Sequence, residues 1–208
     1  MSLTVLITGF GRFPGAPFNP SGPLARAVTR RRRPAFADVS RVLHIFETSY
    51  AAVDRDLPKL IARHKPDIVL MFGLAGRTGF VRVETRARNT RSTLFPDVTG
   101  FRPHQREIVP HKFHAVGLAP FVSLVAASRS ARVPTRLSRD AGKYLCNYVY
   151  WRALEASRSG TLAQFIHIPP ISRVPRPLGK RRRMSQARLA HAGEAILLAL
   201  LTAQRRLG

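Results

Sequence analysis

The sequence has one cysteine among its 208 residues, so no disulfide can form within the chain. It has no apolar run long enough to cross a bilayer, and the opening run at residues 3–10 has the length of one buried strand. It also lacks an early segment with a charged start, a long apolar stretch and a small-residue cleavage site. These absences predict a soluble, cytoplasmic protein in which a free thiol is stable.

Acidic residues are scarce, because 11 Asp and Glu stand against 35 Lys and Arg, a net charge of +24. Such a balance can indicate nucleic-acid binding. However, the arginines are spread along the chain, and tight basic runs occur only at residues 30–33 and 180–183. No zinc-ligand spacing, aromatic RNA-binding strand or basic zipper accompanies them. We therefore expect solvated basic surfaces and no specific nucleic-acid site, with salt-sensitive adhesion to polyanions.

Strand-like and helix-like segments alternate along the chain. Strands are predicted over residues 3–10, 39–46, 67–73, 80–88, 134–138 and 162–168, and helices over residues 21–33, 50–63, 118–128, 143–157 and 184–206. The helix at 50–63 is expected to break or bend near Pro58, and the strand at 80–88 is expected at one edge of the sheet. Residues 90–112 and 169–183 are predicted to be long loops.

This alternation predicts the α/β class, with a single domain over residues 1–208. The expected architecture is a three-layer α/β/α sandwich around a mostly parallel, twisted sheet. In such sheets functional side chains gather in loops beyond the carboxyl ends of the strands.

Three side chains in separate segments are candidates for nucleophilic catalysis. Cys146 falls at the start of a predicted helix, where the helix dipole and free N–H groups favour a thiolate. His167 lies in an apolar strand and could accept the thiol proton, and Glu84 could orient the imidazole. Each also has a structural interpretation: the cysteine and histidine can be core residues, and a glutamate in an edge strand usually faces water. Sequence spacing alone does not bring the three together.

The whole chain resembles pyroglutamyl-peptidase I, also called pyrrolidone-carboxylate peptidase. Four segments, in the family's order, are similar to the family patterns TGFxxFGG…NPS, GQAG…ERVAIN…PDxxG, SxTAGTxVCN and FIHVP. They are residues 5–10 with Phe13, Gly15 and 19–21; residues 73–76 with Glu84, Asn89, 96–97 and Gly100; residues 138–147; and residues 165–169.

The resemblance implies a cysteine omega-peptidase that removes an amino-terminal pyroglutamate from peptides through a thioester, with no metal or cofactor. Cys146 would be the nucleophile, His167 the general acid and base, and Glu84 the residue that orients the histidine. Phe10 and Phe13 would flank the flat pyrrolidone ring, and Asn19 and Leu74 would also lie at the substrate. Family members often form homo-oligomers, so a dimer or tetramer is possible.

The chain departs from the family pattern around these residues. Leu74 replaces a glutamine, Thr85 replaces the arginine after the glutamate, and Leu94 replaces a further arginine, for which Arg91 is a possible substitute. Gly11 and Pro14 replace an acidic residue and a glycine in the opening motif. Two alternatives therefore stay open: a thiol hydrolase of another N-blocked peptide or amide, and a weakly active or inactive relative that binds acidic partners through its basic surface.

Overall fold

The structure is a computed structural model that describes residues 2–13, 15–171 and 184–207. A six-stranded sheet has the order β2–β1–β3–β8–β4–β7. Its strands are β1 (Leu3–Phe10), β2 (Val39–Phe46), β3 (Ile68–Leu74), β4 (Val81–Glu84), β7 (Thr135–Ser138) and β8 (Leu162–Ile168). Neighbouring strands are parallel except β4 and β8, which are antiparallel. The prediction of a mostly parallel sheet is confirmed.

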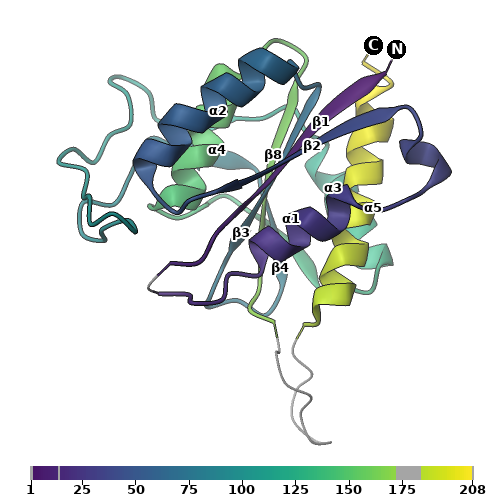
Figure 1. Cartoon of the computed structure of the whole chain (residues 1–208), viewed down its shortest axis with the longest axis horizontal. Coiled ribbons are helices and arrows are strands. Elements are labelled where there is room, and N and C mark those ends of the chain that lie inside the picture. Colours follow the sequence, from purple (N-terminus) through teal and green to yellow (C-terminus); the bar gives the residue numbers. More distant parts are fainter. Residues whose placement is uncertain (1, 14, 172–183, 208) are drawn as a thin grey trace, which may run out of the picture.

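Helices cover both faces of the sheet (Figure 1). One face packs on α1 (Ser21–Thr29), α3 (Phe121–Ser130) and α5 (Gln186–Gln204), and the other packs on α2 (Tyr50–His64) and α4 (Leu145–Ala156). A short 3-10 turn, Pro34–Phe36, follows α1. This arrangement confirms the three-layer α/β/α sandwich. None of the described helices is long and apolar enough to cross a bilayer.

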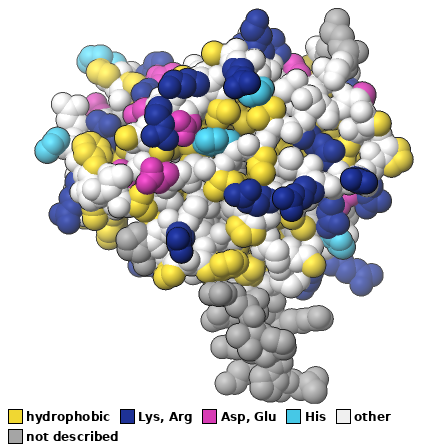
Figure 2. All heavy atoms as spheres, viewed as in Figure 1, with side chains coloured by type: hydrophobic (Ala, Val, Ile, Leu, Met, Phe, Trp, Pro, Cys, Tyr) yellow, Lys and Arg dark blue, Asp and Glu magenta, His cyan; other side chains and the backbone are white. Residues whose placement is uncertain are grey.

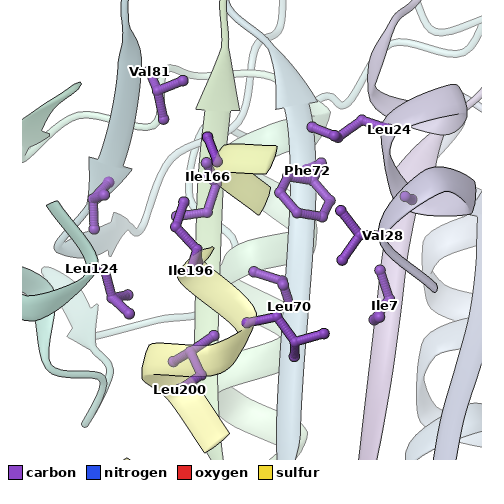
Figure 3. Packing of buried hydrophobic residues seen from close by; sticks show 14 of the residues in the cluster. Ile7, Leu24, Val28, Leu70, Phe72, Val81, Leu124, Ile166, Ile196 and Leu200 are labelled. Atoms are coloured by element: carbon purple, nitrogen blue, oxygen red, sulfur yellow. The ribbon is translucent and has the colours of Figure 1, made fainter. Parts of the chain in front are cut away.

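Alternation along each buried strand divides its side chains between two apolar clusters. Ile7, Leu70, Phe72 and Ile166 point to the first face, where they meet α1 and α5 (Figure 3). Burial of each such side chain contributes about 1.5–3 kcal/mol to stability. The intervening residues point to α2 and α4; among them are Leu6, Val69, Met71 and Phe165. The second face carries the candidate site at the carboxyl ends of β3 and β8.

The predicted edge strand at residues 80–88 is wrong in two respects. β4 lies inside the sheet, because β7 pairs with its outer side. The segment also splits at Thr85, whose N–H and Oγ1 both donate to the carbonyl of Ser138. Its remainder, β5 (Arg86–Arg88), leaves the main sheet and pairs with β6 (His114–Val116), a strand that the sequence did not predict.

Helix boundaries differ from the predictions where prolines and caps decide them. α2 runs unbroken through Pro58, and Ser49 caps its start, because the Ser49 hydroxyl accepts the Ala52 N–H. α3 begins only after Pro120, and α1 ends at Thr29, before the basic run that leads to Pro34. Proline fixes its own φ and disfavours helical geometry in the residue before it, so Pro120 marks the start of α3.

The predicted loop at residues 90–112 is confirmed, and two side chains of the family-like motif hold it. Asn89 accepts the N–H groups of Ile108 and Val109 and donates to the carbonyls of Val109 and Lys112. Asp97 accepts from Tyr50, Thr99 and Phe101. The predicted loop at 169–183 falls mostly outside the described residues.

Candidate active site

One cross-strand row of residues carries the centre of the site. In β3 and β8, Gly73 is the register partner of His167, and in β4 and β7, Arg82 is the partner of Arg136. His167 and Arg82 are partners across the antiparallel pair. Because directly paired residues point to the same side of a sheet, all four positions face the α2 and α4 side.

Cys146 is brought to this row by the start of α4. A Cβ built on Gly73 would lie 2.7 Å from the Cys146 sulfur, so the sulfur packs directly against Gly73, whose register partner in β8 is His167. The turn into α4 passes through Gly142, whose φ of +88° is disfavoured for residues with a side chain. Cys146 is the second residue of the helix, where backbone N–H groups have no carbonyl acceptor within the helix.

His167 is held by Glu84 from the neighbouring strand. Its Nδ1 lies 2.7 Å from Glu84 Oε1, and both side chains are buried. The Glu84 carbonyl in turn accepts from Gln164 and Tyr150. Because Nδ1 is used by the carboxylate, Nε2 is the nitrogen left to exchange a proton. The interpretation of Glu84 as a solvent-facing residue is therefore wrong.

Arg82 also belongs to this cluster, although the sequence analysis assigned it no role. Its Nε donates to Glu84 Oε1 at 2.9 Å, and the same guanidinium donates to Ser138 and to the carbonyl of Asp140. The signal was present in the sequence, because two residues separated by one in a strand share a face. Because the segment was predicted to be an edge strand, Glu84 was expected to face water, and Arg82 was not considered as its partner.

The surroundings of Cys146 disfavour the ionised form of its thiol. Burial, followed by the charge of Glu84, raises the pKa of Cys146 to about 12, and Arg82 acts in the opposite direction. The expectation that the helix start would favour a thiolate is therefore outweighed by burial. A thiol with a raised pKa needs a base to remove its proton before it can react, and His167 lines the same cavity as Cys146.

A cavity of about 210 Å³ opens in front of the sulfur. Its lining includes Cys146 and His167 and all four residues expected at the substrate, namely Phe10, Phe13, Asn19 and Leu74. Glu84 lies behind the histidine and does not line this space. The volume suits a compact, uncharged group between apolar walls.

Asn19 differs from the expectation in how its polar atoms are used. Its Nδ2 donates to the Gly11 carbonyl, and its Oδ1 accepts from the N–H and hydroxyl of Ser21. Asn19 therefore braces the turn between β1 and α1, next to the wall formed by Phe10.

The positions that depart from the family pattern have clear places in the structure. Leu94 is 75% exposed, and Arg91 donates to the carbonyl of Gln105 in the long loop and lines neither of the cavities beside His167. Arg91 therefore does not substitute for a cation in the cavity. Lys143, at the turn into α4, is a basic residue that does line it. Pro14 lies outside the described residues.

The described residues contain no group of three or more His, Cys, Asp or Glu side chains arranged as metal ligands. Lys and Arg side chains occur at several separate places on the surface drawn in Figure 2.

Comparison with known proteins decides the family. The family model "Pyroglutamyl peptidase" matches residues 3–190. The chain belongs to the pyroglutamyl peptidase family. A pyrrolidone-carboxylate peptidase of Clavibacter michiganensis is 34% identical over 171 residues, which cover 80% of this chain and 78% of that protein. One of Thermococcus onnurineus is 32% identical over 80% of this chain and 84% of its own length.

A solved structure leads to the same family. The pyrrolidone carboxyl peptidase of Thermococcus litoralis superposes with a TM-score of 0.87 at 26% identity, over 99% of this chain and 96% of that chain. The fold of this pyroglutamyl peptidase family member therefore extends over nearly the whole sequence.

Proposed function

We propose that this protein is a cysteine omega-peptidase that removes amino-terminal pyroglutamate from peptides. The observation that supports this most is the contact of 2.7 Å between His167 and Glu84, beside a cavity that Cys146 and His167 both line. The family membership supports the same activity.

In the proposed first step, His167 Nε2 takes the thiol proton as the Cys146 sulfur attacks the carbonyl carbon that follows the pyrrolidone ring. The tetrahedral oxyanion is stabilised by N–H groups in the first turn of α4. Glu84 offsets the charge that His167 gains.

In the second step, His167 returns the proton to the leaving amine, and the bond between carbon and nitrogen breaks to give a thioester. Water then attacks the thioester with His167 as base. Pyroglutamate leaves, and the thiol regains its proton. The apolar wall of Phe10 and Phe13 packs on the ring, which carries no charge.

The test is release of a fluorescent amine from a pyroglutamyl amide by purified protein. Cys146→Ala and Cys146→Ser should both abolish release while the fold, checked by circular dichroism, is retained. A panel with N-acetylated and N-formylated amides measures selectivity for the closed ring. Wild-type protein that releases no amine from pyroglutamyl amides would contradict the proposal.

The single-domain boundaries 1–208, the cytoplasmic location and a homo-oligomeric state stay predictions. The absence of a specific nucleic-acid partner also stays a prediction, and it is tested by the salt dependence of any binding.

A further inference from the structure

A second, larger hollow adjoins the small cavity on the other side of His167. It has a volume of about 580 Å³ and is open to solvent along β4 and β7. The two hollows share Ala141, Gly142 and His167 in their linings, so they border each other at these residues. We refer to the larger one as the β7 groove.

The order of the groups along the substrate indicates what occupies the β7 groove. This step rests on the proposed function. The pyrrolidone ring occupies the small cavity with its carbonyl at the Cys146 sulfur. The leaving amine must lie near His167, which protonates it. The rest of the peptide then continues from the histidine away from the small cavity, into the adjoining groove.

The charges along this groove leave one arginine without an acidic partner. The Arg82 guanidinium is paired with Glu84, and the Asp140 carboxylate lies 3.1 Å from Arg88 Nη1. Arg136 is exposed, and no ion pair with a carboxylate joins it within the part of the chain that the structure describes. Its guanidinium instead stacks on the Phe80 ring, 4.5 Å from the ring centroid.

Stacking on Phe80 holds the Arg136 guanidinium in place along the groove. A planar cation on an aromatic face keeps its N–H groups free at the edge to bind a carboxylate. Arg136 also stands two strands from His167 in the cross-strand row, which is about 10 Å at the usual strand spacing. An extended peptide covers that distance in about three residues.

We propose that the β7 groove binds the leaving peptide and that Arg136 makes the enzyme prefer substrates with a carboxylate within the first three residues after pyroglutamate. The preferred substrates are therefore pyroglutamyl peptides with Asp or Glu close to the cleaved bond. Neutral and basic leaving peptides are cleaved more slowly.

The experiment compares amidated peptides that differ at one position. In each pair, Glu or Gln stands at the first, second or third residue after pyroglutamate, in an otherwise neutral sequence, and kcat/KM is measured by chromatography of the products. Because one exposed charge pair contributes modestly, we expect the Glu peptide of the best pair to exceed its Gln partner by about three- to fivefold. The ratio should approach one in high salt.

Substitutions then assign the preference to one side chain. Arg136→Gln should bring the ratio of Glu to Gln peptides close to one, and Arg136→Lys should preserve part of it. Arg63→Gln removes the same charge from an exposed site in the last turn of α2 and should leave the ratio unchanged.

The outcomes separate this inference from the proposed function. If wild-type protein cleaves Glu and Gln peptides equally, or if Arg136→Gln keeps the preference, the inference is wrong although the peptidase assignment stands. If no pyroglutamyl peptide is cleaved, both are wrong.

Discussion

Gly73 is the position where the smallest possible substitution should damage the site most. A Cβ there would lie 2.7 Å from the Cys146 sulfur and 2.5 Å from Cζ of Phe165. Ordinary contacts between such atoms are about 3.5–4.0 Å, so each neighbour would have to retreat by about 1 Å. The added methyl group of Gly73→Ala would therefore press directly on the Cys146 sulfur.

Neither neighbour can move without disturbing the rest of the site. Phe165 is fully buried, and its ring centroid lies 4.9 Å from that of His167 and 5.9 Å from that of Tyr150. A retreat of the phenyl ring is transmitted to the imidazole, whereas a retreat of the sulfur lengthens the distance to the substrate carbonyl. A misplacement of about 1 Å is expected to lower kcat by about 10²-fold.

The assay is steady-state hydrolysis of a pyroglutamyl amide, together with urea unfolding of the same samples. Overpacking should lower the free energy of unfolding by about 1–3 kcal/mol, so Gly73→Ala should still fold. Gly76→Ala is the matched control, because a Cβ there has no atom within 4 Å, and it should keep wild-type kcat. A folded Gly73→Ala protein with kcat within about threefold of wild type would refute the reasoning.

Three further predictions concern the ionisable groups. Glu84→Gln should lower kcat by about 10²–10⁴-fold with little change in KM, because Glu84 orients His167 from behind and does not line the cavity; an unchanged kcat would contradict this role. Arg82→Met removes a positive charge near the sulfur, so it should raise the pKa of Cys146 further. The pH profile of iodoacetamide alkylation should then move to higher pH. A move to lower pH would show that Arg82 does not lower the pKa of the thiol. Since burial raises the pKa of Cys146 from 9.0 to about 12, the unfolded chain releases a proton above pH 9 that the folded chain retains, and stability falls as the pH rises. Cys146→Ala lacks this contribution, so its urea midpoint should fall less than that of wild type between pH 9 and 11. If the midpoints of the two proteins fall equally with pH, the thiol already ionises in the folded state.

Local patterns were sufficient to predict most of the fold. β1, β2 and β8 have the predicted bounds. For β1 and β8 the reason is that a mostly apolar run bounded by turn residues specifies a buried strand. The order of the strands was not predictable in the same way, since it depends on which edges pair after the chain has folded. The pairing of β4 with β7 and β8 decides which side chains lie beside His167. It brings Glu84 and Arg82 to the histidine and places Arg136 one strand further along the same row.

In the candidate site, too, the local motifs were predictable from the sequence and the pairing of the strands was not. The motifs around Cys146 and His167 indicated the chemistry, but the position of Gly73 beneath the sulfur comes from the register of β3 and β8. The raised pKa of the Cys146 thiol was also not predictable from the sequence. It depends on how much protein surrounds the sulfur, and a helix start by itself favours the opposite result.

The central place of β8 has a consequence for biosynthesis. Among the strands that the structure describes, β8 is the last to leave the ribosome, yet it lies in the middle of the sheet between β3 and β4. Until residue 168 has emerged, the nascent chain holds two sets of strands with open inner edges, which are templates for intermolecular pairing. Truncated chains that stop before β8 should therefore aggregate or recruit chaperones, and enzymatic activity should appear only when this closing strand is inserted.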